Sequence, residues 1–216
     1  MNTINSRRRA SQLDRSRILE AAIEVARREG TVALSMARVG AEVGAGVSSL
    51  YYHVRNRDEL IQGIVDRAGE SVEHPDPSSK PEQEIENILL AFYDCLRRET
   101  WLVPHLIRAE LVSKAVEPLT DRALLAFHQM GLSEARSFHA LAALLHYTFG
   151  EIQVVAADLE RDASGVFHTS PSSGSTAARF FASANAEAYD FRELFKTTVR
   201  RYLLAVRIET SNEASE

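Results

Sequence analysis

The sequence is poor in residues that crosslink or break a chain. It has one cysteine, Cys95, so no disulfide can form within the chain, and we expect this thiol to be a buried structural residue. Ten glycines and six prolines among 216 residues, with 45% hydrophobic residues, exclude a disordered or fibrous chain. We therefore expect a compact protein with a substantial core.

Long apolar runs are missing as well. No stretch approaches the roughly 20 residues that a membrane-spanning helix needs. The arginine-containing N-terminus lacks the hydrophobic block of a signal peptide. We expect a cytoplasmic protein that does not bind a membrane.

Patterns typical of strands, repeats and catalytic sites are also absent. The chain shows no strand-like alternation, no glycine-rich phosphate loop, no H-E-x-x-H and no nucleophile with a base at motif spacing. The sequence therefore predicts an all-α protein that is not an enzyme and carries no cofactor.

The net charge of −5 is unevenly distributed along the chain. Residues 1–66 carry ten basic against eight acidic side chains, whereas residues 67–216 carry fifteen against twenty-two. A basic end on an acidic protein favours an N-terminal module that meets a polyanion such as DNA.

The N-terminal quarter is patterned as four short helices. Residues 16–30 repeat apolar side chains at helical spacing and end in a glycine suited to close a helix. Residues 35–44 form a shorter helix, capped by a serine and ended by a glycine. A third helix is expected over 47–54, and the N-x-x-E capping box at 56–59 opens a fourth. The short glycine-containing turn between the second and third helices predicts a helix-turn-helix.

The third helix carries residues suited to the major groove of DNA. Leu50 and Val54 point inward at i, i+4 spacing and leave polar and aromatic side chains on the outer surface. A recognition helix needs short hydroxyls near base edges and donors for phosphates. The outward residues of these types are Ser48, Ser49, Tyr51, Tyr52, His53, Arg55 and Arg57. Such tyrosines and serines also occur as half-buried core residues and helix caps, so the pattern alone leaves both interpretations open.

The rest of the chain is helical in pattern too. The proline-rich stretch HPDPSSKP at 74–81 indicates a linker or bend, and the Ser-, Gly- and Thr-rich stretch at 163–176 indicates a mobile loop. The expected helices are 82–99, 102–114, 117–130, 133–161, 177–187 and 190–208.

Residues 17–61 resemble the N-terminal domain of the TetR family of transcriptional regulators. The resemblance rests on IL-x-AA in the first helix and on LYYHV followed by basic, Asn, basic and EL. It implies a homodimer whose two domains read adjacent major grooves of a palindromic double-stranded DNA operator. The DNA-contact positions of the family fall on Ala37, Arg38, Val47, Ser48, Ser49, Tyr51, Tyr52, His53 and Arg57.

Some positions depart from the family pattern. Gly46 and Val47 stand where a polar cap and a long polar residue are common, and Val47 is expected to meet a thymine methyl group. Gly40 replaces the usual alanine, which costs up to about 1 kcal/mol in helix propensity and is expected to allow closer helix packing. The arginine-rich arm at 6–17 either contacts DNA or is a disordered tail.

The larger C-terminal part resembles the tetracycline-repressor branch of this family. Residues 131–152 contain its H-[FY]-T-x-G motif as HYTFG, and residues 180–206 are similar to its last two helices. The resemblance implies an intersubunit four-helix bundle and a pocket for a small effector. The apolar seam would come from Leu141, Leu144, Leu145, Phe149, Leu194, Val199, Leu203 and Val206, which otherwise are intrachain core. The candidate pocket residues are Phe92, Trp101, His105, Phe127, His128, His146, Tyr147 and Gln153.

The resemblance does not extend to a magnesium site. That branch has a carboxylate on the long helix where this chain has Val154, and a hard cation prefers oxygen ligands. His139 and His146 are too far apart to hold one ion without a further ligand. We expect no essential metal.

These observations predict four segments and one function. The segments are a flexible basic arm at 1–15, a helix-turn-helix DNA-binding domain at 16–62, a ligand-binding and dimerisation domain at 63–208 and a tail at 209–216. The function is that of a sequence-specific repressor released by a small-molecule effector. Two alternatives remain open: a ligand- or partner-binding helical module with a vestigial helix-turn-helix, and a helical enzyme that uses the histidines and carboxylates of the larger domain.

Overall fold

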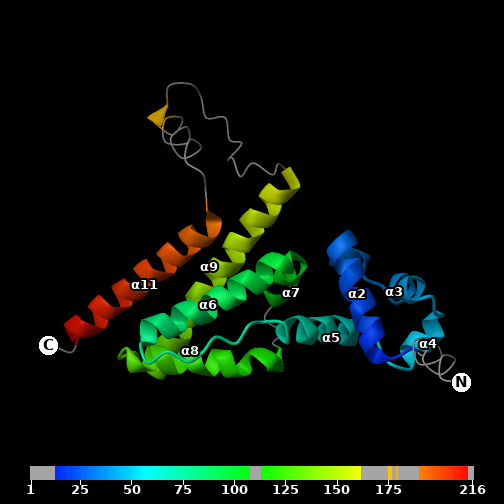
Figure 1. Ribbon diagram of the computed structural model, residues 1–216, viewed down its shortest axis with the longest axis horizontal. Helices are drawn as coiled ribbons and strands as arrows, with labels where there is room; N and C mark the ends of the chain where they lie inside the picture. Colours follow the sequence, from blue (N-terminus) through cyan, green and yellow to red (C-terminus); the bar gives the residue numbers. More distant parts are fainter. Residues whose placement is uncertain (1–12, 108–112, 162–174, 177–178, 180–189, 214–216) are drawn as a thin grey trace, which may run out of the picture. The chain divides into compact units, whose positions relative to one another are not determined.

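The computed structural model describes residues 13–107, 113–161, 175–176, 179 and 190–213 (Figure 1). All regular secondary structure in these ranges is helical, which confirms the all-α prediction. The chain forms two compact units, Met1–Val72 with Trp101–Glu117 and Glu73–Thr100 with Pro118–Glu216. No helix in the described ranges has both the length and the apolar character needed to cross a bilayer.

The first unit is built on α2 (Arg15–Glu29), which begins and ends where the sequence predicts. Asp14 caps this helix, because its carboxylate accepts a hydrogen bond from the Arg17 amide at 2.9 Å. Gly30 ends it with a φ of 76°, which favours glycine over residues with a Cβ. The inner face of the helix is a row of fully buried side chains, among them Ile18, Ala22 and Val25.

The first helix of the helix-turn-helix is α3 (Met36–Val43). Ser35 caps it as expected, accepting a hydrogen bond from the Arg38 amide at 3.1 Å. Gly44 ends it in the left-handed region, with a φ of 71°. Val39 is fully buried, which fixes the inner face of α3.

The second helix, α4 (Val47–Tyr51), is shorter than the predicted 47–54. The chain tightens after the helix, because the amides of His53 and Val54 both donate to the Leu50 carbonyl. Leu50 and Val54 are nonetheless fully buried, so the predicted inward face is confirmed.

The fourth helix, α5 (Arg57–Gly69), opens on a modified capping box. The Asn56 side chain accepts from the Glu59 amide at 2.8 Å, as predicted. The Glu59 carboxylate in turn accepts a hydrogen bond from the Arg55 amide at 2.9 Å, rather than from the Asn56 amide. The helix continues across residues 62 and 63, where the sequence placed the boundary between domains.

The predicted helix at 102–114 is not continuous in the described residues. The chain forms η2 (Thr100–Leu102), α7 (Val103–Leu106) and η3 (Lys114–Val116) instead. Ser113 has a φ of −80° and a ψ of 128°, and its hydroxyl accepts a hydrogen bond from the amide two residues later at 3.3 Å. Such local bonds compete with the helix, which explains the error.

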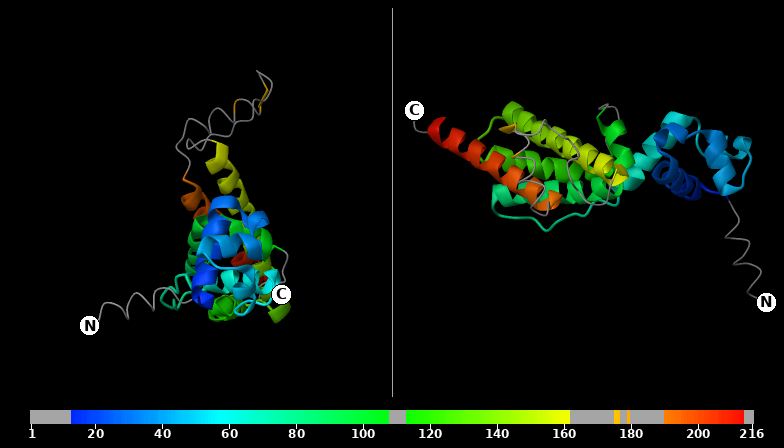
Figure 2. Two further views of the ribbon diagram at one scale, coloured as in Figure 1. Left: turned by 90° about the vertical axis from the view of Figure 1, so that its right-hand side faces the viewer. Right: turned by 90° about the horizontal axis from the view of Figure 1, so that it is seen from above.

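The second unit is a helical bundle (Figures 1 and 2). It contains α6 (Pro81–Arg98), α8 (Glu117–Gln129), α9 (Glu134–Arg161) and α11 (Phe191–Glu213), and α6, α9 and α11 pack against one another. Most of the predicted seam residues turn inward within the chain, and the buried ones are Leu141, Leu144, Val199, Leu203 and Val206.

Three short ion pairs tie α6 to its neighbours, besides a longer one between Glu82 and Arg207 at 3.5 Å. Each joins an acidic residue of α6 to an arginine of α8 or α11, and an arginine guanidinium suits paired hydrogen bonds to a carboxylate. The pairs are Glu84–Arg122, Glu86–Arg200 and Asp94–Arg192, with N–O distances of 2.6, 2.7 and 2.8 Å. Burial raises the pKa of Glu84, but hydrogen bonds from Arg122 and the Ser78 amide outweigh it and hold that pKa below its ordinary value.

Helix α11 extends beyond the predicted end at 208. It reaches Glu213 because Arg136 of α9 pairs with Glu209 and Glu213, both at 2.7 Å. The predicted tail at 209–216 therefore begins within a helix. The predictions for residues 1–12, 162–174 and 180–189 lie outside the described residues.

The glycine at position 40 permits a close approach of α3 to the following turn. A Cβ at Gly40 would lie 2.9 Å from the Ala45 carbonyl oxygen and 3.8 Å from a Leu50 methyl carbon. Backbone at such a distance must shift, since it cannot rotate away as a side-chain tip can. The predicted close packing is confirmed, and it fixes the turn that presents α4.

We expect Gly40→Ala to lower the thermal stability of the protein. Alanine gains up to about 1 kcal/mol in helix propensity, but overpacking costs about 1–3 kcal/mol and should win. Thermal unfolding followed by circular dichroism measures the difference. Gly46→Ala is the matched control, because a Cβ there meets nothing within 4 Å. Equal melting temperatures for both variants would contradict the packing role of Gly40.

Candidate nucleic-acid interface

Helix α4 presents a dense set of exposed side chains above its buried face. Val47 is 37% exposed, Tyr51 50% and Tyr52 89%, whereas Leu50 beneath them is fully buried. Ser48, Ser49 and, on α3, Ala37 are exposed as well, and His53 is half-buried. The structure thus brings the predicted residues of α4 together on one short, locked helix.

Arg38 is held in a closed ring of alternating charges between α2 and α3. Its Nε and Nη2 donate to the two carboxylate oxygens of Glu29 at 3.0 and 2.6 Å, and Nη2 also donates to Glu42 at 2.8 Å. Arg28 closes the ring through Glu42 at 2.9 Å and Glu29 at 3.0 Å. We call these four residues the α2–α3 ring.

The α2–α3 ring holds the Arg38 guanidinium in position through two of its three nitrogen atoms, Nε and Nη2. In the described residues its Nη1 makes no hydrogen bond, so this nitrogen can meet a phosphate while the other two hold its position. The hydrogen bonds from Arg38 and then Arg28 lower the pKa of Glu29 to about 2. Within the ring, only the Arg38–Glu42 pair has the i, i+4 spacing of neighbours on one helix; Arg28 and Glu29 are brought to them by the fold.

Arg57 has a structural role that the sequence did not reveal. Its Nε donates to the Leu34 carbonyl at 2.9 Å and its Nη2 to the Thr31 carbonyl at 3.1 Å. It thereby satisfies carbonyls of the segment before α3, which a residue 23 positions away in sequence cannot be predicted to do. Arg55, by contrast, is 88% exposed and pairs with Glu59 at 3.1 Å.

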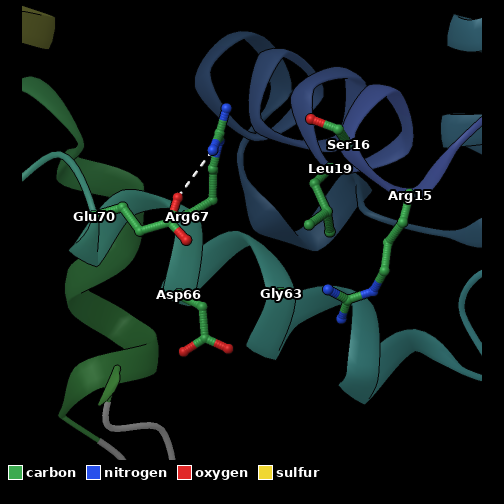
Figure 3. Close-up of a pocket in the computed structure, with 7 residues that line it drawn as sticks. All are labelled: Arg15, Ser16, Leu19, Gly63, Asp66, Arg67 and Glu70. Carbon is green, nitrogen blue, oxygen red and sulfur yellow. Dashed lines mark hydrogen bonds and ion pairs between the residues drawn. The ribbon is translucent and has the colours of Figure 1, made fainter. Parts of the chain in front are cut away.

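A cavity of about 210 Å³ lies between α2 and α5 (Figure 3). Gly63 allows the two helices to approach there, because a Cβ at this position would lie 2.7 Å from a Leu19 methyl carbon. The arginines that line the cavity are paired with acidic residues of the protein: Arg67 contacts Glu70 at 2.9 Å, and Arg15 lies 3.8 Å from Glu59. We therefore assign this cavity to helix packing.

Comparison with known proteins identifies the fold of this interface. Residues 18–64 match the family described as "Bacterial regulatory proteins, tetR family". This segment of the chain matches the TetR family. This confirms the resemblance predicted from the sequence, and the matched residues contain α3, α4 and the α2–α3 ring.

Two similar curated proteins are named HTH-type transcriptional repressors. HTH-type transcriptional repressor DrrR1 of Streptomyces coeruleorubidus is 30% identical over 139 residues, which are 62% of this chain and 50% of that protein. Repressor Rv1353c of Mycobacterium tuberculosis is 34% identical over 62 residues, or 29% of this chain and 24% of that protein. The matches therefore span about half of the first relative and a quarter of the second.

Two solved structures share the fold of most of the chain. ActR of Streptomyces coelicolor, in complex with actinorhodin, has a TM-score of 0.70 at 19% identity and covers 92% of this chain and 99% of its own. BioQ, of Mycobacterium smegmatis, bound to its double-stranded DNA operator has a TM-score of 0.60 at 17% identity, with coverage of 81% and 96%. At this identity the likeness concerns the fold.

The eight candidate residues of the effector pocket are dispersed. Trp101 and His105 belong to the first unit and the other six to the second. Phe127 is fully buried in the core, and the exposed His128 contacts the Leu132 carbonyl through Nδ1 at 2.9 Å. The remaining four divide by exposure: Phe92 and Tyr147 are half-buried, and His146 and Gln153 are exposed. The assignment of these residues to a pocket stays a prediction.

The α2–α3 ring should make stability depend on acid pH. Because the pKa of Glu29 is lowered from 4.5 to about 2, its stabilising effect is present above about pH 4.5 and is lost as the pH falls toward 2. Glu29→Gln should therefore lower the melting temperature at pH 6, and the difference from the wild type should shrink to nothing near pH 2.

Thermal melts between pH 6 and pH 2 test this dependence. Glu24→Gln is the control, since Glu24 lies on the same helix and pairs with Arg27 outside the ring. A difference between the wild type and Glu29→Gln that stays constant with pH would show that the ring does not stabilise the fold through the Glu29 carboxylate.

Proposed function

We propose that this protein is a ligand-responsive transcriptional repressor that binds a palindromic DNA operator as a homodimer. The observation that carries the proposal is α4 with the residue that follows it, which expose two serine hydroxyls and two tyrosines while Leu50 is fully buried. A recognition helix needs this combination, because its outer residues must reach base edges from a fixed position.

The proposed contacts divide by role. Ser48 and Ser49 lie at the start of α4, where short hydroxyls come nearest to base edges. Tyr51, Tyr52 and His53 extend outward toward bases and phosphates at the groove edge. On α3, Ala37 lies on the exposed surface beside the Arg38 guanidinium, and Val47 offers an apolar contact for a thymine methyl. We propose that Arg57 chiefly holds the loop before α3.

A homodimer would bury apolar side chains that α9 and α11 leave exposed. Phe138 on α9 is 60% exposed, and Leu204 and Ile208 on α11 are 57% and 54% exposed. Leu204 and Ile208 lie four residues apart on one face of the helix. Two copies of α4 can then enter major grooves about 34–36 Å apart, one helical turn of DNA.

Release from DNA requires an effector that distinguishes two conformations of the dimer. A ligand shifts an equilibrium only by its difference in affinity for the two states. ActR, a structural neighbour, has been crystallised with actinorhodin, and BioQ with its operator. These complexes support an effector site in the second unit and a DNA site on α4 of this chain.

A role in transcription also bears on where the protein acts and on whether it catalyses a reaction. The named relatives are transcriptional regulators, which are not enzymes. We propose that the chain has no catalytic activity and acts in the cytoplasm, where bacterial DNA is found.

The double variant Ser49→Ala with Tyr51→Ala should lose DNA affinity but keep its fold. Each lost hydrogen bond to DNA costs about 0.5–1.5 kcal/mol in affinity, whereas exposed side chains contribute little to stability. Fluorescence anisotropy with labelled DNA from upstream of its own coding sequence, against a scrambled duplex, measures the loss. Ser211→Ala, at an exposed serine on α11, serves as the control.

Two results would contradict the DNA assignment. Unchanged affinity of the double variant would exclude α4 as the recognition helix. Equal and weak binding of both duplexes, falling steeply with salt, would mean that arginines alone bind phosphate, and would favour a partner-binding module.

The double variant Leu204→Glu with Ile208→Glu should be a monomer that has lost operator affinity. Two carboxylates at the dimer seam would remain buried and unpaired, which is strongly unfavourable. Light scattering after gel filtration should give about twice 24.0 kDa for the wild type and 24.0 kDa for the variant. Leu125→Glu, at an exposed leucine of α8, is the control, and a dimeric double variant would exclude this face.

A further inference from the structure

Tyr93 places an unpartnered hydroxyl in the core of the second unit. Its side chain is fully buried, and within the described residues its Oη has no hydrogen-bond partner. A buried polar group without a partner destabilises the fold, and native proteins keep few of them. Its persistence here calls for a role other than packing.

The ring of Tyr93 is fixed in an aromatic stack that joins three helices. Phe195 of α11 stacks on Tyr93 of α6, with ring centroids 4.4 Å apart and an angle of 25°. Tyr147 of α9 stacks nearly parallel on the same Phe195, with centroids 5.6 Å apart and an angle of 3°. The stack holds the Tyr93 ring in place, so the position of its hydroxyl is preset.

Glu151 is a half-buried acid on the helix that carries Tyr147. It lies one turn after Tyr147 on α9, and in the described residues it makes neither a hydrogen bond nor an ion pair. Burial raises the pKa of Glu151. Burial likewise raises the pKa of Tyr93, and the negative charge of Glu151 raises it further.

The charged neighbours do not neutralise this pair. Arg97, one turn after Tyr93 on α6, lowers the pKa of Tyr93 but is exposed. Asp94 and Asp190 raise that pKa, and Asp94 is already paired with Arg192 at 2.8 Å. The groups around the Tyr93 hydroxyl are therefore mainly acidic, in an aromatic setting.

We propose that Tyr93 and Glu151 form the polar anchor of the effector site, and that the effector is a mainly apolar molecule carrying a cationic amine. The inference rests on the proposed function, because it names the ligand class of that regulator. Neither residue was among the candidates from the sequence.

The chemistry of the pair selects a cation rather than an anion or a neutral molecule. An amine cation would donate hydrogen bonds to the Glu151 carboxylate and the Tyr93 oxygen, and its charge would favour the ionised carboxylate. An anion would be repelled by Glu151, and a neutral molecule would leave the charge of this half-buried carboxylate uncompensated. The apolar part of the ligand would lie against the aromatic side chains.

A matched pair of dyes tests the ligand class on the full-length protein without DNA. Nile blue is a planar cation, and Nile red is its uncharged counterpart with nearly the same ring system. We expect Nile blue to bind at least about ten times more tightly than Nile red, since a hydrogen bond to a charged group corresponds to about tenfold or more in affinity. Fluorescence titration of each dye gives both dissociation constants.

Two substitutions then locate the binding site. Glu151→Gln should weaken Nile blue about tenfold and leave Nile red nearly unchanged, and Tyr93→Phe should weaken Nile blue less. Glu193→Gln, on the exposed surface of α11, is the matched control and should change neither. Equal affinity for the two dyes, unchanged Nile blue affinity in Glu151→Gln, or no saturable binding of Nile blue to the wild type would each overturn the proposal.

The stability of the ligand-free variants supplies an independent readout. A raised carboxyl pKa opposes ionisation on folding, so Glu151 lowers stability as the pH rises above its unfolded value. The melting temperature of Glu151→Gln should therefore exceed that of the wild type at pH 7 and match it near pH 4. The melting temperature of Tyr93→Phe should not fall below that of the wild type. A lower melting temperature in either variant would mean that the group has a structural partner, and would overturn the anchor.

Failure of this inference can be told apart from failure of the repressor assignment. Both variants should bind operator DNA as the wild type does when no dye is present. If the wild type binds no operator, the repressor assignment fails, whereas the dye titrations, made without DNA, stand by themselves.

Discussion

The close approach of α3 to the turn before α4 is the constraint on which the DNA-binding unit depends. Gly40 has no Cβ, so the Ala45 carbonyl can approach to a distance that no other residue would allow. Leu50 then seats α4 in the core, and the hydroxyls of that helix are held outward. A five-residue helix cannot hold itself in place by its own hydrogen bonds. Its geometry comes from this packing.

Much of the first unit could be predicted because its signals are local. Each of its features depends on a few residues that are close together in the sequence. These features are the helix caps Ser35 and Asn56, the turn glycine Gly44 and the inward-pointing pair Leu50 and Val54. The end of α4 was misjudged because a tighter turn satisfies the same carbonyl. The break after α7 was missed because apolar spacing does not report on local serine bonds.

The partners of the arginines could not be predicted from the sequence. The α2–α3 ring and the bonds of Arg57 join residues that only the folded chain brings together. The residues of the effector pocket could not be predicted reliably either, because residue type does not tell which side chains the fold buries. Aromatic and histidine side chains were chosen by type, whereas a fully buried hydroxyl without a partner in the described residues belongs to Tyr93, which the sequence presents as an ordinary inward tyrosine. Burial decides which polar groups lack a partner, and burial is a property of the whole fold.

The ion pairs of Arg136 give the last turns of α11 a structural purpose. Glu209 and Glu213 lie at the C-terminal end of the helix, where negative charge opposes the helix dipole. Arg136, near the start of α9, offsets that unfavourable charge while its own helix gains a link to α11. A chain shortened at residue 208 would leave the α9 guanidinium without either carboxylate. Glu209 and Glu213 thus link the C-terminal end of α11 to the start of α9.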